Sequence, residues 1–119
     1  MNASLPDQQE PMIDRKVALS RVGGDVELLK EIAHLFLETY PGELREIRAA
    51  AERGDAQTLE RSAHGLKGSV ANFGAHAAVE AARRLEDMGR NRQLQEATQG
   101  LLNLELALSS LRPELEALD

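Results

Sequence analysis

Residues 26–53, VELLKEIAHLFLETYPGELREIRAAAER, show the longest helical pattern in the chain. Apolar side chains recur in it at steps of three or four residues, which places them on one side of an α-helix. The stretch therefore predicts a long helix with one buried face. Asp25 is suited to cap its start, and Pro41 with Gly42 predicts a kink inside it. The predicted stripe consists of Leu28, Ile32, Phe36, Tyr40, Leu44, Ile47 and Ala51.

The same helical spacing continues on both sides of this stretch. It predicts a short helix over about residues 13–21, two helices over 56–73 and 75–88, and a last helix from a cap at Asn91 to near Pro113. Gly54, Gly74 and Gly89 are the predicted helix ends. Substantial helices joined by short connections predict an all-α fold, an antiparallel four-helix bundle with an additional short N-terminal helix that covers one end.

The first residues of the chain have a different character. Residues 1–11 are polar, contain two prolines and show no helical period, so we expect a flexible N-terminal segment there. The bundle domain is then predicted to span residues 12–119.

Composition excludes several classes of function. The 119 residues hold 14 Lys plus Arg against 20 Asp plus Glu, a net charge of -6 that disfavours nucleic-acid binding. The chain has no cysteine, which removes disulfides, thiolate zinc sites and cysteine nucleophiles. No apolar run approaches the roughly 18 residues of a membrane span, and the first ten residues lack the features of a signal peptide. We therefore expect a cytoplasmic protein without membrane insertion.

The most informative segment is AHGLKGSVANFG, residues 63–74. His64 projects far from the middle of the apolar stripe of its helix, so the imidazole is predicted to face solvent. Gly65 and Gly68 each cost an exposed helix roughly 1 kcal/mol relative to alanine, and they leave the surface beside the ring bare. Lys67 is placed to bring a cation to the ring, and Ser69 to bond to backbone or to phosphate. The stripe itself consists of Leu59, Ala63, Leu66, Val70 and Phe73.

From spacing alone, two interpretations of this segment stay open. An exposed imidazole with a cleared approach and an adjacent cation is typical of a ring that is modified. A solvated surface histidine, with glycines that serve helix packing, is the alternative.

The segment AHGLKGSVANFGA, residues 63–75, resembles the signature of histidine-containing phosphotransfer (HPt) domains. The match covers His64, Leu66, Lys67, Gly68, Ser69 and Gly74. The upstream stretch VALSRVGGDVELLKEIAHLFLETYP, residues 17–41, resembles the opening helices of the same family. The resemblance extends over nearly the whole chain, from about residue 13 onward.

This resemblance implies a phosphorelay carrier rather than an enzyme. His64 would accept a phosphoryl group on Nε2 from a receiver-domain aspartate and pass it to the aspartate of another receiver domain. Lys67 would neutralise phosphoryl charge and Gly68 would give steric access. The family binds no ATP and needs no cofactor of its own, because the partner receiver domain supplies Mg²⁺ and the catalytic groups. The implied partners are response-regulator receiver domains and a hybrid sensor histidine kinase.

Side chains of the helix that follows Gly74 could assist His64. Arg83, Glu86 and Arg90 share one flank of the following helix, and either arginine could supplement Lys67 if that flank lies beside His64. Family members often carry glutamine or another polar residue near Glu86, where it can hold the second ring nitrogen. A carboxylate there would fix the tautomer, yet it would also repel an incoming phosphoryl group. A solvated face is the alternative for both arginines.

A receiver domain would bind small and apolar residues around His64 within a charged rim. We expect Gly65 and Ala71 in that surface and Glu60 and Arg61 on its rim. A monomer is the simplest expectation for a bundle that presents one helix face. A free-standing carrier and a domain of a hybrid kinase both remain open.

Two other functions compete with phosphotransfer. A di-iron bundle needs two Glu-x-x-His motifs, and the chain has one, Glu31 with His34, whose imidazole projects away from the core. His76 is predicted to be a surface residue of a first helical turn. The stronger alternative is a helical-bundle docking module that binds a signalling partner without phosphotransfer; it predicts that function survives removal of the imidazole.

Overall fold

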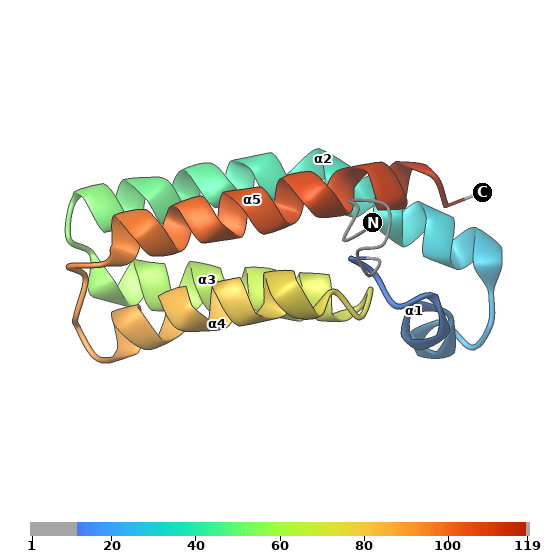
Figure 1. Ribbon diagram of the computed structural model, residues 1–119, viewed down its shortest axis with the longest axis horizontal. Helices are drawn as coiled ribbons and strands as arrows, with labels where there is room; N and C mark the ends of the chain where they lie inside the picture. The colour runs from blue at the N-terminus through green and yellow to red at the C-terminus, as the bar shows by residue number, and fades with distance from the viewer. Residues whose placement is uncertain (1–11, 119) are drawn as a thin grey trace, which may run out of the picture.

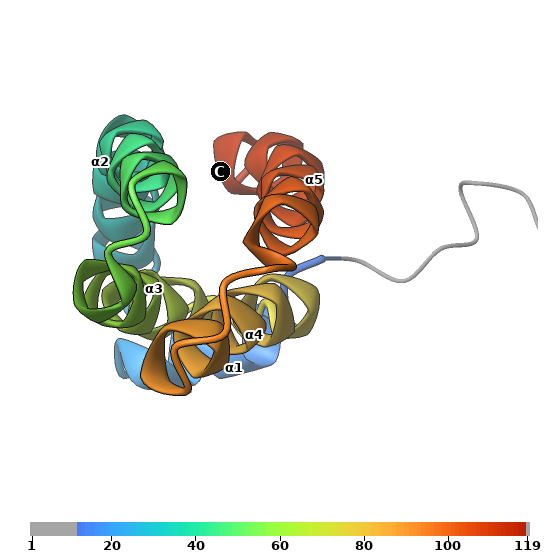
Figure 2. The same ribbon diagram turned by 90° about the vertical axis from the view of Figure 1, so that its left-hand side faces the viewer.

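The computed structural model describes residues 12–118. It contains α1 (Arg15–Arg21), α2 (Val26–Glu52), α3 (Ala56–Ala71), α4 (His76–Arg90) and α5 (Ala97–Glu116), and no strand occurs in this part of the chain. Helices α2 to α5 run alternately up and down as an antiparallel bundle, in which α2 packs on α3 and α5, and α4 packs on α3 and α5 (Figures 1 and 2). The predicted fold class is therefore confirmed.

Helix α1 lies across the end of the bundle where α3 and α4 connect (Figure 1). The backbone N–H of Asp14 donates to the carbonyl of Phe73 at 2.9 Å. Gly74 adopts a φ of +61°, and a Cβ there would lie 2.6 Å from Cβ of Asp14. Glycine is thus required at this turn for both its backbone conformation and its lack of a side chain. The predicted flexible segment, residues 1–11, lies outside the described residues.

The core is aliphatic, as its sequence predicts, with Phe36, Tyr40 and Phe73 in contact within it. The predicted stripe of α3 is wholly buried. Asp25 and Asp55 cap α2 and α3 by accepting from the backbone N–H groups of Leu28 and Thr58. No helix in the described range is both long and apolar enough to cross a bilayer.

The buried stripe of α2 differs from the predicted one. Leu28 is 40% exposed and points away from the core, while Leu29 beside it is buried. The helix continues through Pro41. Its buried positions are Leu29, Ala33, Phe36, Tyr40, Ile47 and Ala50. The steps between these positions follow a heptad rather than a repeated step of four, because a helix that packs along its whole length keeps an apolar seam every 3.5 residues.

Two predictions about the end of α4 are wrong. Gly89 does not end the helix but lies buried within it, against the backbone of Glu60 in α3. Asn91 does not cap the last helix; it is the C-cap residue of α4, and α5 begins only at Ala97. The chain turns between the two helices at Arg92, whose φ of +56° is incompatible with a continuing helix.

Candidate functional site

His64 lies on the outer side of α3, and 68% of its side chain is exposed. Its placement follows from the core stripe, because Ala63 and Leu66 on either side of it are fully buried and turn the imidazole outward. A Cβ added at Gly65 or Gly68 would meet nothing within 4 Å. The predicted exposure of the ring and the predicted bare surface next to it are both present.

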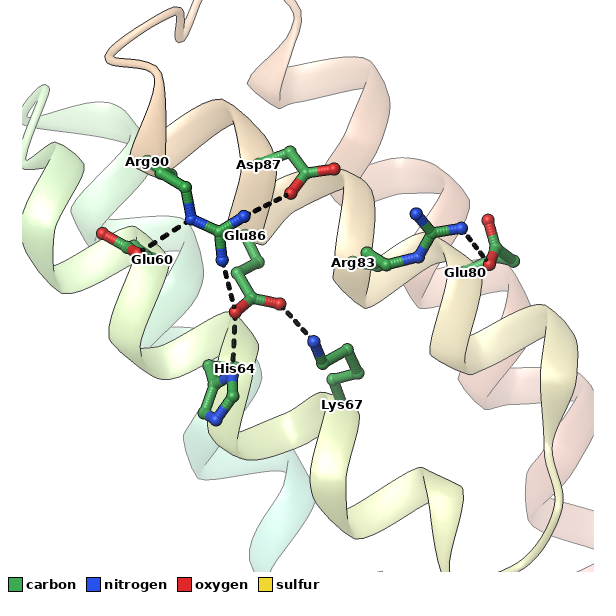
Figure 3. Close-up of polar contacts among 8 residues, drawn as sticks. All are labelled: Glu60, His64, Lys67, Glu80, Arg83, Glu86, Asp87 and Arg90. Carbon is green, nitrogen blue, oxygen red and sulfur yellow. Dashed lines mark hydrogen bonds and ion pairs between the residues drawn. The ribbon is translucent and has the colours of Figure 1, made fainter.

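One ring nitrogen of His64 is occupied by Glu86 of α4. The distance from Nδ1 to Oε2 of Glu86 is 2.7 Å (Figure 3). A carboxylate can only accept, so Nδ1 carries the proton and, in the neutral ring, Nε2 keeps its lone pair. Figure 3 shows Nε2 on the side of the ring that faces away from Glu86. The free nucleophilic nitrogen is therefore the exposed one.

Glu86 is a buried carboxylate, with only 4% of its side chain exposed. Lys67 Nζ lies 2.7 Å from Oε1, and the guanidinium of Arg90 donates to Oε2 at 3.0 Å. Burial alone would raise the pKa of Glu86, but the hydrogen bonds from Lys67 and His64, and their charges, outweigh it and lower the pKa below 4.5. Glu86 is thus ionised at neutral pH and joins the histidine to two cations.

Arg90 belongs to this cluster, whereas Arg83 does not. Arg90 also pairs with Asp87 at 3.1 Å and with Glu60 at 3.4 Å, which links α4 to α3 (Figure 3). Arg83 lies nearer the start of α4 and pairs with Glu80. Of the two arginines expected near the site, the structure brings one to the carboxylate that contacts His64.

The remaining predicted residues surround the histidine on α3. The Ser69 hydroxyl donates to the carbonyl of Gly65 at 3.3 Å, a contact within the helix. Ala71 is half-buried. Gly65 and Arg61 line a groove between α2 and α3, on the other side of His64 from Glu86. The other two histidines are exposed, as predicted: 77% of the His34 side chain is accessible, and His76 opens α4.

The groove was not predicted from the sequence. Its α2 wall includes Glu43, a residue that the predicted stripe of α2 left out. The signal was present, because position 43 continues the heptad of Leu29, Phe36 and Tyr40, and a glutamate at a seam position is unusual. Steps of four along α2 place Glu43 outside the apolar stripe, whereas the heptad places it in the seam.

Chemically, the site offers an exposed imidazole nitrogen, a buried carboxylate that orients the ring, and cations beside it. Within residues 12–118 no group of three or more histidine, aspartate or glutamate side chains is placed to hold a metal ion. The fold and the site together define an antiparallel helical bundle that carries an accessible histidine oriented by a buried carboxylate.

Comparison with known proteins identifies the family. The Hpt domain family model matches residues 31–118, and the chain belongs to this family. It is similar to histidine-containing phosphotransfer protein B (HptB) from Pseudomonas aeruginosa PAO1, with 27% identity over 91% of this chain and 94% of that one and a TM-score of 0.83. Among curated protein sequences, none matches the chain significantly.

A second solved structure shares the fold. The HPT domain of a sensor hybrid histidine kinase from Shewanella aligns with 88% of this chain and 91% of its own, at 16% identity and a TM-score of 0.76. As an Hpt domain, the chain has the general role of a phosphotransfer carrier that works with receiver domains and histidine kinases, and is not a conventional enzyme.

Proposed function

We propose that His64 is the phosphorylated residue, and that it takes its phosphoryl group from a receiver-domain aspartate and gives it to the aspartate of another receiver domain. The observation that carries this proposal is the orientation of the ring. Nδ1 is held at 2.7 Å by Glu86, while Nε2 belongs to a side chain that is 68% exposed. Family membership supports the same role.

The transfer step balances without an added reagent. The Nε2 lone pair of His64 attacks phosphorus, the P–N bond forms, and the P–O bond to the aspartate breaks to release its carboxylate. The proton on Nδ1 stays in place, so the phosphorylated ring is cationic beside the Glu86 carboxylate. Transfer onward reverses these bond changes on the second aspartate. Glu86 acts here as a positioning residue.

Lys67 would contact two groups in turn, the Glu86 carboxylate and the phosphoryl group on His64. It pairs with Glu86 at 2.7 Å, and 27% of its side chain is exposed. On phosphorylation its ammonium would turn toward the phosphoryl oxygens, while Arg90 keeps Glu86 neutralised. Gly68 would leave room for the phosphoryl group and the receiver's active site. We assign Mg²⁺ to the partner receiver domain, and a hybrid sensor histidine kinase to the start of the relay.

Intact mass spectrometry tests the proposal. The protein is incubated with Mg²⁺ and receiver domains phosphorylated in advance, and the product is then treated with acid and with alkali. We expect one added phosphate that is labile in acid and stable in alkali, as for a phosphoramidate. His64→Gln should abolish it.

His34→Gln is the matched control. His34 is also exposed on a helix and lies 3.2 Å from a glutamate, Glu38, but no glycine clears its surroundings. Phosphorylation should persist in this variant. Phosphate that survives in His64→Gln would move the site elsewhere, and no transfer from any active receiver domain would favour the docking module over the carrier.

A further inference from the structure

A groove of about 420 Å³ lies between α2 and α3, next to the proposed phosphorylation site. Gly65 follows His64 in the chain and forms part of the groove wall. Gly65 has no side chain, and a Cβ added there would meet nothing within 4 Å, so the groove wall next to His64 in the chain is open. The residues that line it are Thr39, Gly42, Glu43, Glu46, Arg61, Ser62, Gly65 and Leu66.

Glu43 is the unusual member of this groove. It occupies a seam position of α2, between Tyr40 and Ile47, where the other residues of the heptad are apolar and buried. Its Oε1 atom is covered and has no hydrogen-bond partner within the described part of the chain. Burial raises the pKa of Glu43 above 4.5. The fold therefore carries a half-buried carboxylate whose charge it does not satisfy.

The same groove contains a cationic side chain, but that side chain does not neutralise Glu43. Arg61 of α3 lines the groove, yet it forms no ion pair with Glu43 or Glu46 among the described residues. Glu86 differs from Glu43 in this respect, because it forms ion pairs with Lys67 and Arg90. An unsatisfied buried polar group costs stability, so its presence in the groove needs an explanation, and a partner's donor is one that would supply it.

A bound receiver domain would cover this groove. Protein–protein interfaces of ordinary size bury about 800 Å² on each side, much more than one imidazole and its neighbours. A partner that reaches Nε2 of His64 must therefore also lie over Gly65 and the adjoining groove. The groove presents two glutamates against one arginine, so it favours a positively charged group from that partner.

We propose that this groove is a specificity pocket that receives a basic side chain of the receiver domain, which donates to the Glu43 carboxylate, with Glu46 adding charge at the rim. This inference rests on the proposed function for the identity of the partner. The chemistry it assigns is a lysine or arginine on the receiver surface that faces α2 and α3. Receivers that lack it at this place bind more weakly.

The test measures binding separately from phosphotransfer. Receiver domains encoded in the same genome are titrated, one at a time, into the His64→Gln protein, which cannot be phosphorylated there. Adding Glu43→Gln should weaken binding of the cognate receiver about tenfold, the effect of losing one charge-assisted hydrogen bond. It should also reduce the dependence of binding on NaCl concentration.

Glu31→Gln is the matched control, since Glu31 is a glutamate of the same helix that lines a different groove, near the end of α5. It should leave affinity unchanged. In the protein with His64 intact, phosphoramidate serves as a small donor that needs no docking surface, and Glu43→Gln should not change its rate.

Two outcomes overturn the inference, and a third overturns only the proposed function. Unchanged affinity and salt dependence in Glu43→Gln would show that no cation binds there. A slower reaction with phosphoramidate would mean that Glu43 acts on His64 itself. If binding depends on Glu43 but no phosphotransfer occurs, the specificity pocket is supported and the carrier role is refuted. The two proposals therefore fail separately.

Discussion

Gly89 of α4 lies against the backbone of Glu60 in α3 so closely that a Cβ on it would be 2.6 Å from the Glu60 nitrogen. The two helices are antiparallel, and the contact between Glu86 and His64 lies one turn away from this point along both of them. The close helix approach and the 2.7 Å hydrogen bond of the site are therefore parts of one packing arrangement.

Gly89→Ala should destabilise the protein. The added methyl group meets backbone atoms, which cannot turn aside, so α3 and α4 must separate; we expect a loss of about 1–3 kcal/mol in the free energy of unfolding. Urea denaturation measures it. Gly65→Ala is the control, because its Cβ meets nothing within 4 Å and should stabilise α3 by about 0.5–1 kcal/mol. Equal effects of the two substitutions would contradict the packing role of Gly89.

Substitutions at Gly68 should raise stability and lower transfer. Gly68→Ala meets no neighbouring atom and should add about 0.5–1 kcal/mol through helix propensity. Gly68→Leu should keep most of that gain while slowing transfer from a receiver domain at least about tenfold, because the side chain occupies space that the partner needs. Transfer rates and thermal unfolding of both variants check this. Gln57→Leu, at an exposed site near the start of α3, controls for an added surface leucine.

Glu86 should make stability sensitive to acid. Its pKa is lower in the folded than in the unfolded protein, so its contribution is present above pH 4.5 and is lost as the pH falls through the folded value. Glu86→Gln should cost about 1–3 kcal/mol at pH 7, because Lys67 and Arg90 lose a charged partner. The difference from the wild type should shrink below pH 4.5. Unfolding curves from pH 3.5 to 7 measure it.

Glu80→Gln provides the control for Glu86. Glu80 lies on the same helix and pairs with Arg83, but both side chains are about half exposed. Exposed ion pairs contribute little, so its removal should change stability only slightly at any pH. An equally large loss of stability in Glu80→Gln would show that the contribution of Glu86 does not come from its burial.

The sequence was sufficient for the local features of the site. The stripe from Leu59 to Phe73 determines which way α3 faces, and this alone predicts that His64 is exposed. The open space at Gly65 and Gly68 follows from the same projection. These features depend on one helix only, and helical periodicity describes one helix well.

Relations between helices could not be read in the same way. The role of Gly89 depends on how near α3 comes to α4, and a glycine near a helix end has the same sequence appearance as a C-terminal stop. Which of Arg83 and Arg90 lies near the contact between Glu86 and His64 depends on where α4 lies along α3. Neither the distance nor the register between two helices is encoded in the period of either one.

Glu43 offers the last prediction, with a sign opposite to that of Glu86. Burial raises its folded pKa, so the unfolded chain ionises first as the pH rises and stability is lost between pH 4.5 and the folded value. Arg61 and Glu46 line the same groove, and their charges act on the group in opposite directions. Glu43→Gln should therefore match the wild type at pH 4 and exceed it at pH 7 by about 1 kcal/mol, as expected when an unsatisfied charge is removed. Unfolding measured at both values checks this, with Glu31→Gln as the exposed control. A variant more stable at neutral pH yet weaker in receiver binding would show that the fold gives up stability at position 43 to keep a charge for its partner.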